Sequence, residues 1–206
     1  MLQLLAATSN KNKIREFQEM FDGTDNKVTI VSPATFGGLP EIIEDGTTFE
    51  ENSAIKAKEA SRYADMAAFA DDSGLVVEAL NGEPGINSAR YAGPDATDAQ
   101  RIEKLLENMK GKTNRKAKFV CVISLAYRGN LAAQFRGEVS GVITDAPRGE
   151  NGFGYDPVFI PDGYDKTFAE LGAEVKDSIS HRGKAFALAA DFVKAELATM
   201  DDFEFV

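Results

Sequence analysis

Hydrophobic residues follow two periods along this chain, one typical of strands and one typical of helices. Short apolar runs predict buried strands at residues 2–7, 28–31, 67–70, 75–80, 117–127, 131–139 and 158–160. Apolar residues that recur every three or four positions predict amphipathic helices at residues 13–22, 48–65, 97–110 and from near 180 to beyond 197. Strands that alternate with helices, together with one long hairpin, predict an α/β fold with a mixed sheet. We expect one continuous domain over residues 1–206, with two lobes around a cleft.

Turn and cap residues separate these elements. Residues 128–130 (Arg-Gly-Asn) lie between two strands and are typical of a hairpin. Residues 48–51 and 97–100 have the spacing of helix N-caps. Residues 71–74 (Asp-Asp-Ser-Gly) stand between two apolar runs, so they predict an acidic turn whose carboxylates project at the end of a strand.

The composition narrows the classes of function. The chain carries 23 basic and 33 acidic residues, a net charge of −10, which is unsuited to a general nucleic-acid binder because such affinity comes largely from Lys and Arg. A small polyphosphate can still bind where Lys, Arg, backbone N–H groups and a divalent cation are gathered locally. No apolar run approaches the roughly 20 residues that span a bilayer, and the first residues lack the basic segment of a signal peptide. The single cysteine, Cys121, lies in an apolar run and is expected to be a buried thiol in a cytosolic protein.

The first candidate site follows the first strand, where residues 8–13 lead into a helix. The N–H groups at a helix N-terminus attract phosphate, Lys13 adds a full positive charge, and Asn10 can hydrogen-bond an oxygen. The segment is not a Walker A loop, because Gly-Lys-Ser/Thr is absent. Taken alone, these residues favour a plain helix cap with solvated lysines.

The second candidate is the pair Asp71 and Asp72, with Glu44 in the loop before them. Carboxylates that lie close together hold Mg²⁺ through oxygen and water ligands, and one of them can instead take a proton from an attacking water. The end of a strand is also where open α/β sheets bind ligands. The alternative is a turn in which the aspartates bond their own backbone.

Three weaker candidates follow. Lys56 lies one helical turn after Asn52 and either reaches phosphate oxygens or is solvated. Residues 152–157 (Gly-Phe-Gly-Tyr-Asp-Pro) place Phe153 between two glycines, either as a stacking surface for a base or as part of the core. Residues 178–185, with Lys176 just before them, contain the only histidine beside an arginine at a helix start, and a lone histidine is more often structural.

Together these segments resemble the inosine triphosphate pyrophosphatase family, also called XTP/dITP diphosphatases. The matching strings are Ala7-Thr8-Ser9-Asn10-Lys11-Asn12-Lys13, Phe49-Glu50-Glu51-Asn52, Phe69-Ala70-Asp71-Asp72-Ser73-Gly74-Leu75, Pro84-Gly85-Ile86-Asn87-Ser88-Ala89-Arg90-Tyr91, Gly152-Phe153-Gly154-Tyr155-Asp156-Pro157 and Ser178-Ile179-Ser180-His181-Arg182-Gly183-Lys184-Ala185. They stand in the family's order and span residues 7–185. Six ordered motifs are far more specific than any one of them.

This resemblance implies a fold and an activity. The fold is α/β, a long central mixed β-sheet flanked by helices, with two lobes around an active-site cleft. The activity is the Mg²⁺-dependent hydrolysis of non-canonical purine nucleoside triphosphates (ITP, dITP and XTP) to the monophosphate and pyrophosphate, which cleanses the nucleotide pool. The resemblance further implies a cytoplasmic homodimer whose partner is its small nucleotide substrate, with no nucleic-acid or membrane partner.

The resemblance also implies a role for each candidate residue. Asp72 is the catalytic acid–base residue and a Mg²⁺ ligand, and Glu44 is the second metal carboxylate, with Glu41 or Asp45 as open alternatives. The implied triphosphate contacts are Thr8, Ser9, Asn10, Lys11, Asn12, Lys13, Lys56 and Lys176. The implied nucleoside contacts are Ser73, Phe153, Gly154, Tyr155, Asp156, His181 and Arg182.

The expected base preference depends on hydrogen-bond donors. Hypoxanthine and xanthine present a 6-carbonyl acceptor, whereas adenine presents a 6-amino donor. N–H donors from Arg182 and from the glycine-rich loop would pair with the first and be left unpaired by the second. Two rival functions remain: a pyrimidine triphosphate pyrophosphatase of the Maf type, against which residues 180–182 (Ser-His-Arg) argue, and a non-enzymatic nucleotide sensor, against which Asp72 and the lysines argue.

Overall fold

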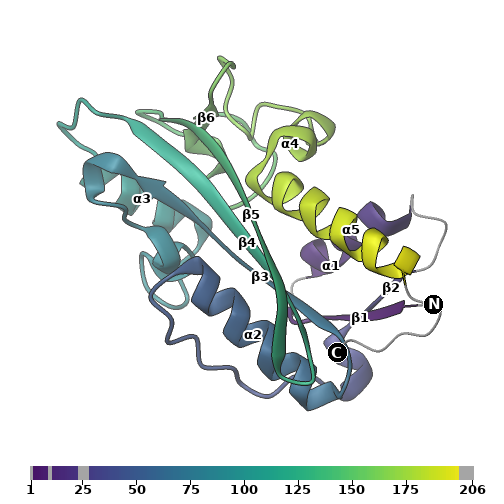
Figure 1. Ribbon diagram of the computed structural model, residues 1–206. Coiled ribbons are helices and arrows are strands. Elements are labelled where there is room, and N and C mark those ends of the chain that lie inside the picture. The colour runs from purple at the N-terminus through teal and green to yellow at the C-terminus, as the bar shows by residue number, and fades with distance from the viewer. Residues whose placement is uncertain (1, 9–10, 23–27, 200–206) are drawn as a thin grey trace. The chain divides into compact units, whose positions relative to one another are not determined.

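The computed structural model of the protein describes residues 2–8, 11–22 and 28–199 (Figure 1). Within these ranges one mixed sheet has the strand order β2-β1-β3-β4-β5-β6. β1 pairs in parallel with both β2 and β3, and β5 pairs antiparallel with β6. The strands are β1 (Leu2–Ala6), β2 (Val28–Val31), β3 (Ala68–Val77), β4 (Lys116–Tyr127), β5 (Asn130–Ile143) and β6 (Phe159–Pro161). The α-helices are α1 (Lys11–Asp22), α2 (Phe49–Ala64), α3 (Asp98–Asn108), α4 (Ala173–Ile179) and α5 (His181–Thr199). The predicted α/β fold with a mixed sheet is confirmed.

The chain divides into two compact units. Unit 1 consists of Met1–Asp72, Val122–Arg136 and Ala185–Val206, and unit 2 consists of Ser73–Cys121 and Gly137–Lys184. The long strands β3, β4 and β5 contribute residues to both units. The expectation of one domain over residues 1–206 stays a prediction.

Small residues bring α2 close to β3 in unit 1. Ala57 and Ala60 of α2 are fully buried and belong to the same core clusters as Ala68 and Ala70 of β3. Alanine has no atoms beyond Cβ, so a helix that presents alanines can approach a sheet closely. Side chains that leave α2 beside these alanines, such as Lys56, therefore stand next to β3.

The core of unit 2 lies between α3 and the strands. The predicted stripe of α3 is confirmed, because Ile102, Leu105 and Met109 are buried against Phe119 and Phe159. The helix begins as expected, with a full capping box in which the Thr97 hydroxyl accepts from the Gln100 amide and the Gln100 side chain accepts from the Thr97 amide.

The predicted acidic turn at residues 71–74 is wrong, because β3 runs through it without interruption from Ala68 to Val77. Asp-Asp-Ser-Gly has the composition of a turn, but each aspartate has a lysine partner in the structure, which offsets the cost of enclosing two carboxylates in a sheet. Since successive residues of a strand point to opposite faces, Asp71 turns to Lys13 on α1 and Asp72 turns to Lys56 on α2.

Other local predictions are refined. The hairpin is confirmed, with Arg128 and Gly129 at φ angles of 47° and 80°, the left-handed pair that a two-residue turn requires (Figure 1). At α2, Thr48 caps the Glu51 amide as expected, and the Glu51 carboxylate accepts from the Thr47 amide at 2.6 Å. The short helix α4 was not expected, because its seven residues are too few to develop a clear period.

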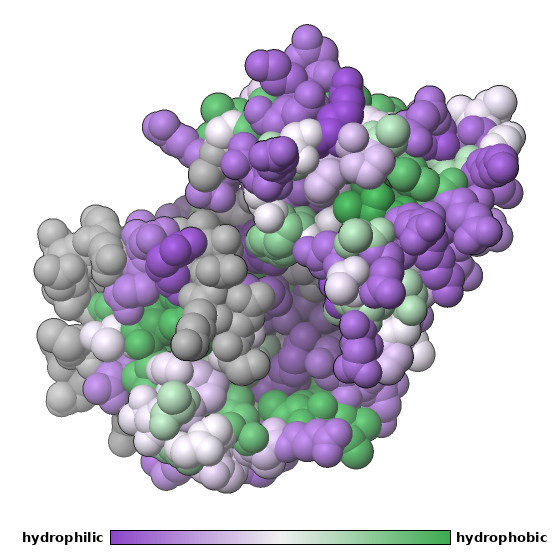
Figure 2. Space-filling model, turned by 180° about the vertical axis from the view of Figure 1, so that it is seen from behind, coloured by the Kyte–Doolittle hydropathy of each residue, from purple (hydrophilic) through white to green (hydrophobic). Residues whose placement is uncertain are grey.

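The surface agrees with the acidic composition. On the face shown in Figure 2, hydrophilic residues predominate and hydrophobic residues form small separate patches. In the described part of the chain, every helix is too short or too polar to cross a membrane. Cys121 is fully buried, as expected.

Gly141 tests how β5 packs on β6. A Cβ at this position would lie 2.1 Å from the backbone oxygen of Ile160, and a backbone atom cannot move aside as a side chain can. Gly141→Ala should therefore lower the free energy of unfolding by about 1–3 kcal/mol, measured by urea denaturation. The control is Ser140→Ala on the same strand, which is exposed and should change stability by less than about 0.5 kcal/mol. Equal effects of the two changes would contradict this packing.

Candidate active site

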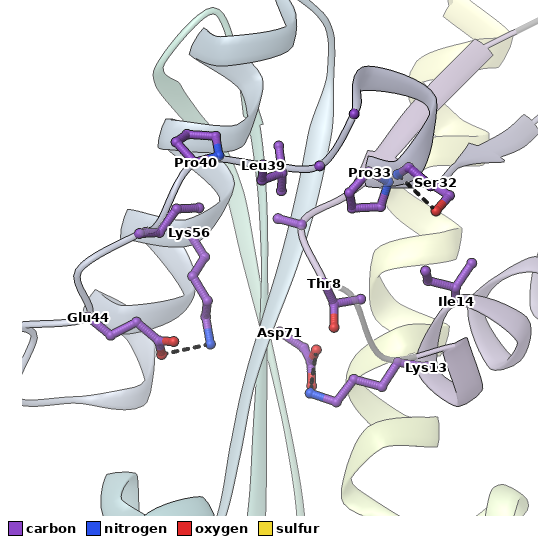
Figure 3. Close-up of a pocket in the computed structure, with 15 residues that line it drawn as sticks. Thr8, Lys13, Ile14, Ser32, Pro33, Leu39, Pro40, Glu44, Lys56 and Asp71 are labelled. Atoms are coloured by element: carbon purple, nitrogen blue, oxygen red, sulfur yellow. Dashed lines mark hydrogen bonds and ion pairs between the residues drawn. The ribbon is translucent and has the colours of Figure 1, made fainter. Parts of the chain in front are cut away.

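A pocket of about 930 Å³ lies in unit 1. Thr8 and Lys13 line it from the segment after β1 and from α1, Glu44 from the loop before α2, Lys56 from α2 and Asp71 from β3 (Figure 3). In the close-up, Lys13 and Asp71 point toward each other, and Lys56 points toward Glu44 (Figure 3). The structure thus brings together residues that were singled out separately in the sequence.

Lys13 and Asp71 form a close ion pair. The Lys13 ammonium donates to both carboxylate oxygens of Asp71, at 2.9 and 2.8 Å. The Asp71 side chain is 1% exposed and that of Lys13 is 22% exposed, so a buried carboxylate holds a lysine that still faces the pocket. This arrangement differs from the solvated lysine that residues 8–13 alone favour.

Lys56 joins two further carboxylates. Its ammonium lies 2.9 Å from Glu44 Oε2 and 2.9 Å from Asp72 Oδ1. Burial alone would lower the pKa of Lys56, but the charges of Asp72, Asp71 and Glu44 outweigh burial, so this pKa lies above its ordinary value. Of the three acids that the sequence left open as the second metal carboxylate, Glu44 is brought to Lys56 and Asp72.

The second carboxylate oxygen of Asp72 does not take part in the pair with Lys56. Its Oδ2 is buried and has no hydrogen-bond partner among the described residues. Burial raises the pKa of Asp72 above its ordinary value, and the charges of Glu44 and Asp71 add to this effect while Lys56 opposes it. A buried carboxylate oxygen without a partner is costly, and a cation offsets that cost.

The donor set around Asp72 fits a divalent ion that prefers oxygen ligands. In the described side chains no group of three or more His, Cys, Asp and Glu is arranged to hold a metal. Glu44 and Asp72 could supply two carboxylate ligands, and water and substrate oxygens would complete the shell, which is the usual pattern for Mg²⁺ and unlike that of structural zinc.

Charge at this site is unbalanced among the described side chains. Lys13, Lys56, Glu44 and Asp71 line the pocket, and Asp72 lies beside it as a second partner of Lys56. Each lysine is already paired with a carboxylate, and the described carboxylates outnumber the lysines. A polyphosphate would meet this excess of negative charge unless a cation accompanied it.

A second cluster of predicted residues lies in unit 2. Phe153 is 44% exposed, so it lies at the surface rather than in the core. The Lys176 ammonium lies 4.7 Å and the Arg182 guanidinium 5.4 Å from its ring centroid. His181 stacks on Phe119 at 4.8 Å and, like Arg182, is 7% exposed. Two cationic donors and an exposed ring are thus held in one place.

The amides of the glycine-rich loop are used within the protein. The Phe153 amide donates to Asp156 Oδ2 at 2.9 Å, and the Gly154 amide donates to Asp98 Oδ2 at 2.7 Å. The expectation that loop N–H groups select a base carbonyl is therefore wrong for these two amides. Asp98 belongs to none of the six motifs; only its place in the first turn of α3 marked it in the sequence.

The remaining predicted residues are placed as follows. Ser9 and Asn10 lie outside the described residues, and Lys11 and Asn12 begin α1, without described side chains. Ser73 lies in β3, and the buried Tyr155 hydroxyl donates to the Ser88 carbonyl.

Two further predicted residues have contacts within the protein. Asn52 is buried and accepts from the Gly46 amide, so its side chain holds the loop before α2 in place and does not face a ligand. Lys176, implied as a triphosphate contact, lies in unit 2 beside Phe153.

Comparison with known proteins gives consistent matches. The model of the Ham1 family matches residues 4–192. A protein of Desulfotalea psychrophila named dITP/XTP pyrophosphatase is 51% identical over 184 residues, which cover 89% of this chain and 82% of that protein. A protein of Geobacter sulfurreducens with the same name is 46% identical over 193 residues, covering 93% and 96%. The structure of the Staphylococcus aureus Ham1 protein superposes with a TM-score of 0.87 at 43% identity, covering 94% of this chain and 99% of that one. The structure of a HAM1 protein from Coxiella burnetii superposes with a TM-score of 0.88 at 41% identity, covering 95% of this chain and 100% of that one.

The Lys13–Asp71 pair can be tested by a double-mutant cycle. We expect Lys13→Met and Asp71→Asn to show a coupling energy of about 1–3 kcal/mol in urea unfolding without nucleotide or metal, because one partner is almost fully buried. The surface pair Arg15 and Glu19 on the same helix, whose side chains are 67% and 64% exposed, is the control and should show less than about 0.5 kcal/mol. A coupling near zero for the first pair would contradict the geometry.

Proposed function

The chain belongs to the Ham1 family, and on this basis we propose that it hydrolyses non-canonical purine nucleoside triphosphates, with dITP, XTP and ITP as substrates, to the monophosphate and pyrophosphate. The observation that carries the proposal is the pocket of unit 1, which Lys13, Lys56, Glu44 and Asp71 line, together with Asp72, which is paired with Lys56 and has a buried carboxylate oxygen without a described partner. Lysines suit phosphate oxygens, and the free carboxylate oxygen suits a divalent cation. The names of the relatives supply the substrate class.

In unit 1 the proposed roles follow from charge. Lys13 and Lys56 would bind phosphate oxygens, and Glu44 and Asp72 would hold Mg²⁺. Bound there, Mg²⁺ would offset part of the roughly four negative charges of a triphosphate and would stabilise the leaving pyrophosphate. Lys56 already pairs with both Glu44 and Asp72. Its positive charge therefore reduces the repulsion between the two carboxylates when no metal ion is bound.

Asp72 is the proposed general base. Its carboxylate accepts a hydrogen bond from the attacking water and takes its proton while the water oxygen bonds to the α-phosphorus. The bond from the α-phosphorus to the bridging oxygen breaks, and pyrophosphate leaves with that oxygen.

In unit 2 the proposed role is base recognition. Phe153 offers an exposed ring for stacking, and Arg182 is the proposed donor to the 6-carbonyl of hypoxanthine or xanthine. Adenine presents an amino group at the same position, which offers the guanidinium no acceptor. The family resemblance further supports a cytoplasmic homodimer, and light scattering of the purified protein tests the dimer.

A substrate panel tests the proposed specificity. Pyrophosphate release in Mg²⁺ should give a kcat/KM for dITP, ITP and XTP about ten- to a hundredfold above that for ATP, which corresponds to one charge-assisted hydrogen bond gained or lost. UTP should be a poor substrate, because a pocket that fits the two fused rings of a purine makes fewer contacts with the single ring of uracil. Preference for UTP would instead favour a pyrimidine triphosphate pyrophosphatase, and release of inorganic phosphate without pyrophosphate would contradict the site of cleavage.

Asp72→Asn tests the proposed base. The change keeps the shape of the side chain but removes its negative charge, so turnover of dITP should fall by about a hundredfold or more, with thermal unfolding little altered. Asp71→Asn should reduce turnover less, because Asp71 acts through Lys13. Asp191→Asn, an exposed aspartate of α5 in the same unit, is the control. Parent-like turnover by Asp72→Asn would refute the assignment.

A further inference from the structure

The loop that carries Phe153 is fixed by a buried carboxylate. Asp156 is 3% exposed, and its Oδ2 accepts from the Phe153 amide at 2.9 Å and from the Lys176 ammonium at 2.6 Å. Asp98 holds the next amide, that of Gly154, at 2.7 Å. Two successive N–H groups of the loop are thus bound by protein carboxylates.

Gly152 leaves the space that this carboxylate occupies. Its φ is +78°, and a Cβ there would lie 2.2 Å from Asp156 Oδ2. Any other residue would therefore be strained in its backbone and would also displace the carboxylate. Gly152 therefore leaves room for the Asp156 carboxylate, in addition to letting the loop turn.

Asp156 binds both the backbone amide of Phe153 and the Lys176 ammonium beside the Phe153 ring. The Lys176 ammonium that it binds lies 4.7 Å from the centroid of Phe153 and 5.9 Å from that of Phe168. Without the carboxylate, Lys176 would lose its ion pair, and the Phe153 amide would lose its acceptor. The exposed ring and the partly buried lysine would then no longer be fixed relative to each other.

We propose that Asp156 is a positioning residue for base recognition, which acts through Phe153 and Lys176 rather than by touching the nucleotide. This rests on the proposed function. It departs from the nucleoside contact that the family resemblance implies for Asp156, because a carboxylate that is 3% exposed and already binds two donors is enclosed by the protein. Hydrogen-bond donors that are held in place cannot turn away from the 6-amino group of adenine, so adenine binds poorly. Donors that are free to move can rearrange and accept adenine.

The test compares selectivity with stability. Asp156→Asn keeps an acceptor for the Phe153 amide but removes the charge that holds Lys176, so the ratio of kcat/KM for ITP to that for ATP should fall about tenfold. Asp98→Ala frees the Gly154 amide without touching Lys176 and should lower the ratio about two- to threefold. The control is Glu170→Gln in the same unit, which likewise has a carboxylate bound to a backbone amide, that of Thr167, and paired with a basic residue, Arg148. It should leave the ratio unchanged.

Two further readouts separate positioning from a merely structural role. Calorimetric binding of inosine monophosphate, which involves no turnover, should weaken about tenfold in Asp156→Asn. In a cycle with Lys176→Met, the double variant should bind inosine monophosphate no more weakly than the worse single variant, because the two residues act as one unit. A parent-like ratio and parent-like binding in Asp156→Asn, or additive losses in the cycle, would overturn the proposal.

The outcome also distinguishes this proposal from the proposed function. If the parent protein releases no pyrophosphate from ITP, the proposed function fails. If the parent prefers ITP over ATP and Asp156→Asn retains both that preference and the melting temperature, only the positioning role fails.

Discussion

Three carboxylates share the ammonium groups of the two lysines described at the pocket of unit 1, with Asp72 beside the pocket, and the rest of the site depends on this excess of negative charge among the described side chains. Carboxylates that are withdrawn from water need partners of opposite charge. Lys13 pairs with Asp71, and Lys56 pairs with both Glu44 and Asp72. One oxygen, Asp72 Oδ2, is left without a partner among the described residues. The pocket is therefore poorly suited to a polyphosphate alone and well suited to a polyphosphate that arrives with a divalent cation.

The pleat of β3 creates this distribution. Adjacent residues of a strand point to opposite faces, so two aspartates that are neighbours in the sequence have different partners and different tasks. Asp71 is satisfied at both oxygens and fixes Lys13, whereas Asp72 is satisfied at one oxygen and has no described partner at the other. The alanines of α2 and β3 let Lys56 approach closely enough to join Asp72 to Glu44. A comparable division occurs in unit 2, where Asp156 is enclosed and Phe153 is exposed.

Much of this could be predicted from the sequence, and the failures have physical causes. The periods of apolar residues located the sheet strands and four of the helices, and the ordered motifs located the residues around Asp72 and Phe153. The continuous course of β3 could not be predicted, because Asp-Asp-Ser-Gly has the local preference of a turn and its lysine partners are distant in sequence. The use of the Phe153 and Gly154 amides by Asp156 and Asp98 was hidden for the same reason, since hydrogen bonds from a loop depend on which carboxylates the fold brings to it. Local sequence gives the residue types, and tertiary contacts decide which polar groups remain for a ligand.

The requirement for a divalent cation in binding itself is the central claim, and it can be measured without turnover. The most direct measurement is calorimetric binding of a dITP analogue with a non-hydrolysable imido link between the α- and β-phosphates, in Mg²⁺ and then in EDTA. Because the described carboxylates at the site outnumber the lysines, the analogue should bind at least about a hundredfold more tightly in Mg²⁺, which corresponds to about 2.7 kcal/mol. Equal affinity in Mg²⁺ and in EDTA would contradict the account.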